Sequence, residues 1–344
     1  MKSYPFFWTS LIKWFLSFCA FILLAGCGEN LQGELLFIEE DSQKGFNYPY
    51  FLFLPDGVSE HKETMLIVEP NNSGFASNNF EEHVEKARRV ATREFYIGNY
   101  LSRKAEYPLL IPVFNRPKSN WKIYTHSLDR DVMLQKGNSL ERLDLQLIEM
   151  VDDARSKLAE RQIKTKKKFF LTGFSASGLF ANRFSLIHPE KVQAVAAGGL
   201  NGLLMLPKKE HQGEILNYPL GINDFETLFE KEFDLLAFKE VPQFWYMGEL
   251  DENDAVPYDD AYDEDERQVV YAALGREMQP QRWDNCRKVY SEEGVKARVR
   301  TYEGVGHEHP EVVKEDIYKF FKANLAEGSS AAFSHTSGSI FSQD

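Results

Sequence analysis

The sequence predicts an α/β fold, in which a mostly parallel, eight-stranded sheet is flanked by helices. Short apolar runs alternate with longer helical patterns along most of the chain, which is typical of a sheet whose strands are joined by crossover helices. The 344 residues are 43% hydrophobic and 14% aromatic, which is enough apolar mass for one large core and too much for a disordered or fibrous protein.

Eight apolar runs are predicted to be strands. The early runs lack helical patterns between them, so we expect the sheet to begin with antiparallel strands, whereas the later runs alternate with helices. The runs cover Leu35–Glu39, Tyr48–Leu54, Thr64–Glu69, Leu109–Phe114, Lys168–Thr172, Val192–Ala197, Gln243–Met247 and Arg298–Tyr302.

Six segments show helical periodicity. The clearest has apolar residues at three- and four-residue steps from Leu140 to Leu158, and Ser139 is placed to cap its N-terminus. The segments cover Phe80–Phe95, Leu140–Glu160, Gly178–His188, Asp263–Leu274, Arg282–Glu293 and Glu311–Asn324.

The first 26 residues are predicted to be a secretory signal peptide. Lys2 and Lys13 precede an apolar run from Trp14 to Ala25, which is shorter than the roughly 20 residues that a spanning helix needs. Leu24-Ala25-Gly26-Cys27 resembles the lipobox of bacterial lipoproteins, which implies export and a lipid anchor on Cys27. Gly28 at the next position implies the outer membrane if the cell is Gram-negative.

The remaining chain divides into a short linker, one large domain and a tail. Residues 27–33 are expected to form the lipidated N-terminus and linker, residues 34–326 the domain and residues 327–344 a disordered tail rich in Ser, Ala and Gly. Residues 200–240 form a long connection rich in Phe and Leu, and we expect a lid there.

Charge and cysteine content exclude some classes of protein. The formal net charge of −12 disfavours binding to phosphate backbones, so no nucleic-acid partner is expected. Removal of the signal peptide discards Cys19 and lipidation uses Cys27, which leaves Cys286 alone and no internal disulfide.

A candidate nucleophile follows the fifth predicted strand. An apolar run leads directly into Gly173-Phe174-Ser175-Ala176-Ser177-Gly178 and then into a helical pattern. A serine on such a strand-to-helix turn has its hydroxyl clear of the sheet, and small residues on either side relieve the crowding. Ser177 stands where this pattern usually has its second glycine.

A nucleophilic serine needs a histidine base that a carboxylate orients, and both are expected after later strands. The seventh strand is followed by Asp251 and Asp254, of which we favour Asp251 as the acid, with Asp259 and Asp260 as weaker alternatives. The eighth is followed by His307 on a Gly-Val-Gly lead, with His309 as the alternative base.

Two backbone N–H groups are expected to form an oxyanion hole. One is that of Ala176 at the start of the helix, and the other comes from the loop after the third strand. In that loop Asn72 is preferred over Asn71, although a simple Asn-Asn-Ser-Gly turn would have the same sequence.

Together these motifs resemble the α/β-hydrolase superfamily over roughly residues 35–325. Residues 173–199, GFSASGLFANRFSLIHPEKVQAVAAGG, are similar to the poly(3-hydroxybutyrate) depolymerase and feruloyl-esterase-like branch. The resemblance implies a hydrolase that acts through an acyl-enzyme, and it leaves the substrate open because peptidases and thioesterases share the scaffold.

Two other polar segments have competing interpretations. After the fourth strand, His126 and Arg130 either contact the substrate or belong to a salt-bridged loop. The acidic run from Glu249 to Arg267 lacks the ligand spacing of an EF-hand, so we expect an acidic surface there and no metal site.

The sequence therefore predicts a lipid-anchored serine esterase without a cofactor. Ser175, Asp251 and His307 form its triad, and its partners are a small or polymeric ester and a lipid bilayer. The alternatives are a serine peptidase on the same fold and a non-catalytic binding lipoprotein.

Overall fold

The computed structural model describes residues 31–58, 63–71, 74–259 and 261–325. The predicted signal peptide, Cys27 and the predicted disordered tail lie outside these residues. The elements described below all belong to one unit of the chain that begins at Gln32.

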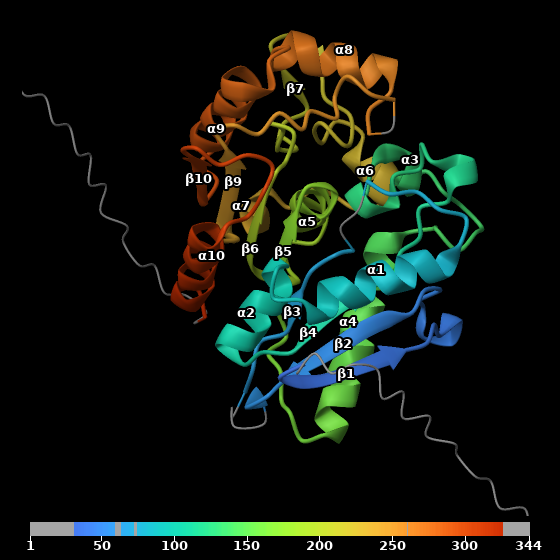
Figure 1. Ribbon diagram of the computed structural model, residues 1–344. Helices are drawn as coiled ribbons and strands as arrows, with labels where there is room; N and C mark the ends of the chain where they lie inside the picture. The colour runs from blue at the N-terminus through green and yellow to red at the C-terminus, as the bar shows by residue number, and fades with distance from the viewer. Residues whose placement is uncertain (1–30, 59–62, 72–73, 260, 326–344) are drawn as a thin grey trace, which may run out of the picture. The chain divides into compact units, whose positions relative to one another are not determined.

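The centre of the fold is an eight-stranded sheet (Figure 1). In spatial order the first strand is antiparallel to the second and the second to the third, and all following neighbours are parallel. In spatial order the strands are β1 (Gly33–Ile38), β2 (Tyr50–Pro55), β4 (Leu109–Pro112), β3 (Ile67–Val68), β5 (Phe169–Phe174), β6 (Val192–Gly198), β9 (Gln243–Gly248) and β10 (Ala297–Tyr302).

These strands confirm the prediction of a mostly parallel sheet with an antiparallel beginning. The ends of the other seven strands agree with the predicted runs to within two residues, whereas β3 is reduced to Ile67–Val68. Thr64, at the start of the predicted third strand, makes only an isolated bridge to Thr165. Parallel strands joined by crossovers expose one common edge at their carboxyl ends, and ligand sites form there.

Helices cover both faces of the sheet because its strands alternate apolar side chains between two cores. Phe169 and Leu171 of β5 point into one core, and Phe170 and Phe174 point into the other. The first core also contains residues of α4 (Leu143–Glu160), α5 (Ala176–Ile187), α8 (Glu264–Ala273) and α9 (Trp283–Glu292). The second contains residues of α1 (Phe80–Thr92), α2 (Ile97–Ala105) and α10 (Glu311–Ala323) (Figure 1).

All six predicted helices are present. The structure adds α2 and three short helices that the sequence analysis did not identify, α3 (Arg130–Met133), α6 (Phe225–Phe229) and α7 (Leu235–Glu240). Shorter helical turns lie at Ser42–Lys44, Lys118–Asn120, Thr125–Ser127 and Met278–Arg282.

The predicted cap of the long central helix is wrong. The helix α4 begins at Leu143 with Arg142 as its N-cap, three residues after Ser139. The Ser139 hydroxyl instead lies 2.9 Å from the hydroxyl of Tyr48 and forms a hydrogen bond with it. Ser139 therefore ties the approach to α4 to the chain before β2.

The connection over residues 200–240 is built into the first core. Phe225, Phe229 and Phe238 are buried there, and a two-stranded sheet of β7 (Glu210–His211) and β8 (Glu214–Ile215) lies in the same connection. A segment that covers the core can have the same composition as a mobile lid. In this connection the phenylalanines are part of the core.

None of the helices that the structure describes is both long and apolar enough to cross a membrane. Cys286 is a free, buried cysteine, and burial raises the pKa of its thiol to about 12.

Candidate functional site

The turn between β5 and α5 holds Ser175 in a backbone conformation that is rare for a residue with a side chain. Its φ is 60° and its ψ is −125°. Its backbone N–H donates to the Gly198 carbonyl at the end of the neighbouring strand β6, at 2.9 Å. A conformation of this kind costs of order 1–3 kcal/mol and persists where the surroundings enforce it, which is frequent at functional sites.

Two glycines make this turn possible. A Cβ atom at Gly173 would lie 2.3 Å from the Ser177 carbonyl oxygen, and one at Gly178 would lie 2.6 Å from that of Gly198. Both distances are shorter than any van der Waals contact, so the strand and the helix approach too closely for a side chain. This close approach explains sterically why small residues stand on either side of Ser175.

Ser177, which replaces the expected glycine, braces the turn. Its hydroxyl donates to the Phe174 carbonyl and accepts from the Phe174 N–H, both at 2.9 Å. The side chain is completely buried. The departure from the usual motif therefore adds two hydrogen bonds inside the turn that presents Ser175.

The structure brings His307 and Asp251 together. The Nδ1 atom of His307 lies 2.9 Å from Oδ2 and 3.1 Å from Oδ1 of Asp251. The carboxylate is buried, whereas the imidazole side chain keeps 27% of its surface exposed. Because a carboxylate can only accept, Nδ1 is the donor, and Nε2 of the neutral ring carries the lone pair that a base needs.

Close contact between two loops produces this pair. The N–H of Leu250 donates to the Val305 carbonyl at 2.8 Å, next to the parallel strands β9 and β10. A Cβ atom at Gly248 would lie 2.3 Å from the carbonyl oxygens of Val305 and Gly306. Gly248 therefore allows the acid loop to lie directly against the base loop.

The acid–base pair and the serine turn lie at the same edge of the sheet. Register places Phe174 of β5 beside Gly198 of β6, and Gly198 beside Tyr246 of β9. The ring centroids of Phe174 and His307 are 4.6 Å apart. Ser175 directly follows Phe174, so the imidazole packs against the residue that precedes the serine.

The alternative acids have other partners. Asp254 forms an ion pair of 2.6 Å with Arg282, which is completely buried, and Asp259 lies 2.5 Å from Arg267. Asp260 lies outside the described residues. Among the candidates that the structure describes, Asp251 is the carboxylate in contact with His307.

The alternative base, His309, lies in a different environment. Its ring is buried between Phe174 and Phe95, with each centroid 4.9 Å away. Burial lowers the pKa of His309 to about 4, and within the described parts of the chain no carboxylate contacts it.

The backbone N–H of Ala176, a predicted oxyanion donor, lies at the start of a helix. Ala176 is the first residue of α5, where N–H groups have no acceptor within the helix. The buried side chain of Asn71 donates from Nδ2 to the Phe114 carbonyl at 3.3 Å, which leaves its backbone N–H as the group that could serve. Asn72, the preferred residue, lies outside the described residues.

The two predicted substrate-contacting residues are engaged within the protein. His126 is buried, and its Nε2 lies 2.7 Å from the Phe114 carbonyl. Arg130 forms an ion pair of 2.6 Å with Asp224 and donates to the Tyr218 carbonyl at 2.7 Å. Arg130 thereby ties α3 to the connection over residues 200–240.

The acidic run has structural roles. Asp263 forms a capping box with Glu266 at the start of α8, with hydrogen bonds of 2.8 and 3.0 Å. In the described part of the chain, no group of three or more His, Cys, Asp or Glu side chains could hold a metal ion.

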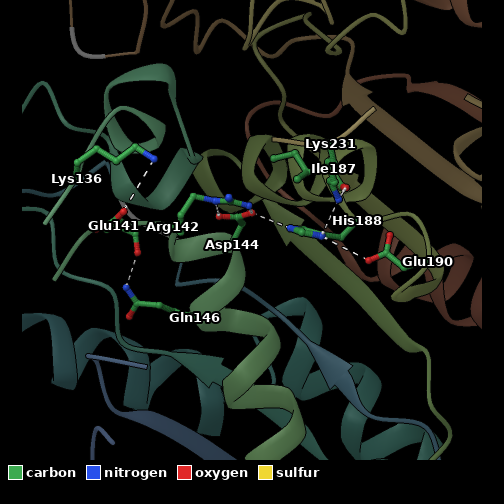
Figure 2. A network of polar contacts seen from close by, with 9 residues as sticks. All are labelled: Lys136, Glu141, Arg142, Asp144, Gln146, Ile187, His188, Glu190 and Lys231. Carbon is green, nitrogen blue, oxygen red and sulfur yellow. Dashed lines mark hydrogen bonds and ion pairs between the residues drawn. The ribbon is translucent and has the colours of Figure 1, made fainter. Parts of the chain in front are cut away.

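A second Asp–His pair lies far more deeply in the protein. Figure 2 shows Asp144 between Arg142 and His188, whose Nε2 lies 2.7 Å from Oδ2 of Asp144. The other ring nitrogen faces Lys231 at 3.3 Å and Glu190 at 3.6 Å. Both ring nitrogens thus have charged partners and the ring is buried. This network joins α4 and α5 to the segment between α6 and α7.

Burial alone would raise the pKa of Asp144, but hydrogen bonds from Arg142 and His188 outweigh it and lower the pKa to about 2. The carboxylate is therefore ionised at neutral pH and fully paired. These properties are those of a buried structural network.

Two residues that contact the acid–base pair were not identified from the sequence. Asn253 places Nδ2 at 3.3 Å from Nε2 of His307. Gln279 donates from Nε2 to the Gly248 carbonyl at 2.7 Å. Its position two residues after Asp251 places Asn253 in the acid loop but does not show where its side chain points, and nothing in the sequence connects Gln279 to a loop so distant in the chain.

Comparison with solved structures supports the architecture. The chain is similar to poly(aspartic acid) hydrolase-1 from Sphingomonas sp. KT-1, with a TM-score of 0.52 and 14% identity over 84% of this chain and 97% of that one. This chain has the α/β-hydrolase fold. It is also similar to an S-formylglutathione hydrolase from Agrobacterium tumefaciens, with a TM-score of 0.47 and 10% identity over 86% of this chain and 96% of that one.

Searches of protein-family models and of curated proteins found no match. In the α/β-hydrolase fold the nucleophile, acid and base follow one another in that chain order. Ser175, Asp251 and His307 have this order, and they follow β5, β9 and β10.

Proposed function

We propose that this protein is a serine hydrolase that cleaves carboxylic esters through an acyl-enzyme. The observation that carries the proposal is the convergence of two features at one sheet edge. Ser175 occupies a positive-φ turn, and His307, which is hydrogen-bonded to Asp251, packs against the preceding residue, Phe174.

In the first half of the reaction, the Ser175 oxygen attacks the ester carbonyl while Nε2 of His307 takes the hydroxyl proton. Asp251 stabilises the imidazolium that forms, and the Ala176 N–H holds the negative oxygen of the tetrahedral intermediate. The intermediate then expels the alcohol, which receives the proton from Nε2, and the acyl group stays on Ser175.

In the second half, water attacks the acyl carbonyl and gives a proton to Nε2. Collapse of the second intermediate releases the carboxylic acid and returns the proton to Ser175. The second oxyanion donor is assigned to the backbone of the loop at Asn71 and Asn72. No cofactor takes part in this scheme.

The proposal is tested by the hydrolysis of short-chain, aromatic and polymeric esters by the purified protein and by Ser175→Ala and His307→Ala. Each substitution is expected to lower turnover by at least about 10⁴-fold without unfolding the protein, because only oxyanion and binding effects remain. Near-wild-type turnover by either folded variant would contradict the assignment, and cleavage of peptides in preference to esters would make the protein a peptidase.

We also propose that the protein is exported and anchored to the cell envelope through lipid on Cys27. The support comes from the sequence Leu24-Ala25-Gly26-Cys27 after a short apolar run. Incorporation of a labelled fatty acid into the full chain, and its loss in Cys27→Ala, is the expected result. Unchanged labelling of the variant would contradict the anchor.

A further inference from the structure

Asn253 contacts both members of the acid–base pair. Its backbone N–H donates to Oδ1 of Asp251 at 2.9 Å, and its side-chain Nδ2 lies 3.3 Å from Nε2 of His307. One residue therefore braces the carboxylate through its backbone and the imidazole through its side chain. Replacement of the side chain leaves the backbone hydrogen bond available, so the two contacts can be tested separately.

The direction of the side-chain hydrogen bond follows from the opposite side of the ring. Asp251 can only accept, so Nδ1 of His307 carries the hydrogen, and Nε2 of the neutral ring is an acceptor. The Asn253 amide nitrogen is a donor, and it therefore matches this tautomer. It would clash electrostatically with a ring whose hydrogen were on Nε2.

The loop that carries Asn253 is held on both sides. Gln279 donates to the Gly248 carbonyl at 2.7 Å, before the loop, and the buried Arg282 pairs with Asp254 at 2.6 Å, after Asn253. The amide is thus presented to His307 from a fixed loop, although Asn253 itself is exposed.

We propose that Asn253 is a positioning residue for His307, whose side-chain amide fixes the neutral ring in the tautomer with hydrogen on Nδ1 and the lone pair on Nε2. This is the form that a general base requires, so the inference rests on the proposed function for its catalytic meaning. In the reaction, the hydrogen bond between Nε2 and the Asn253 amide is replaced first by one to the Ser175 hydroxyl and then by one to the leaving-group oxygen.

The test is an NMR measurement on the full-length protein labelled with ¹⁵N and ¹³C in histidine, with His307→Gln used to assign the signals. Wild type is expected to show the neutral ring with hydrogen on Nδ1. Asn253→Ala is expected to mix the two tautomers, because the donor to Nε2 is lost. Asn253→Asp places an acceptor beside Nε2 and is expected to shift the hydrogen toward that nitrogen.

Asn120→Ala is the matched control, because Asn120 is an exposed asparagine on a short helical turn outside the acid and base loops. An unchanged tautomer in both Asn253 variants, as in this control, would overturn the proposal. The NMR measurement does not depend on turnover. A changed tautomer together with wild-type ester hydrolysis by Ser175→Ala would support the role of Asn253 at the ring while the proposed function fails.

Discussion

At the scale of single residues, the choice between Asp251 and Asp254 depends on a partner that is distant in the chain. The two carboxylates are three residues apart, so the local sequence could not separate them. Arg282, which begins the approach to α9, is completely buried and pairs with Asp254. Asp251 remains available to His307.

The two carboxylates should therefore respond differently to the same substitution. Asp251→Asn is expected to lower kcat by about 10⁴-fold with little change in stability, because the ring loses the partner that orients it. Asp254→Asn leaves the buried guanidinium of Arg282 without its anion, and should lower the free energy of unfolding by on the order of 1–3 kcal/mol while the folded protein keeps most of its activity.

Urea unfolding and ester turnover of the two variants, measured side by side, check this expectation. A larger loss of kcat in the Asp254 variant than in the Asp251 variant would reverse the assignment of the acid.

The sequence predicted the residues with local signals and missed those without them. Ser175 and His307 stand in glycine-containing turns after apolar strands, and these turns are visible in the sequence. The hydrogen bonds of Ser177 and Asn253 depend on side-chain direction, which composition and spacing do not report.

At the scale of elements, the strands and longer helices were predictable because each has a clear pattern of buried positions. The helix α2 was missed because it is short and begins with weak local signals. It has nine residues, Gly98 and Asn99 in its first turn are poor helix formers, and its N-cap, Tyr96, makes no side-chain hydrogen bond to the helix. The short helices α3, α6 and α7 have four to six residues, which is too few for a period to be recognised.

One buried carboxyl group links two of these elements. Glu69 follows β3 and accepts a hydrogen bond from the Gly98 N–H in the first turn of α2, at 2.6 Å. Burial raises the pKa of Glu69 to about 8, and the hydrogen bond from Gly98 opposes this only in part. The folded protein therefore binds a proton at Glu69 between about pH 4 and pH 8 that the unfolded chain releases.

Stability should consequently fall as the pH rises through this window. Glu69→Gln keeps the shape and an acceptor for Gly98 but cannot ionise, so the variant should lose this part of the pH dependence. The free energy of unfolding of the variant minus that of wild type is expected to be larger at pH 8 than at pH 5, by on the order of 1–3 kcal/mol. Equal slopes in urea unfolding of the two proteins across this range would contradict a protonated Glu69.

At the scale of the whole molecule, the chemistry depends on the carboxyl edge of the parallel sheet. The turn after β5 and the loops after β9 and β10 reach this edge from strands that register places in a fixed order. The alternation of runs and helices predicted a mostly parallel sheet, but it did not predict the order of the strands in the sheet. The burial of Phe225 and Phe229 in residues 200–240 could not be predicted either, because it is decided by tertiary packing.

Residues 200–240 contact other parts of the fold at two points. Arg130 pairs with Asp224 at one point, and Lys231 contacts His188 at another (Figure 2). Such contacts make residues 200–240 a packed cover on the first core.

Labelling of the full-length protein with a fluorophosphonate probe, followed by peptide mapping, tests whether Ser175 is an activated nucleophile. Modification of Ser175 is expected, with none in Ser175→Ala and a strongly slowed reaction in His307→Ala. No labelling of the folded wild-type protein, or labelling at a different residue, would show that Ser175 is not an activated nucleophile and would favour a binding function for the site.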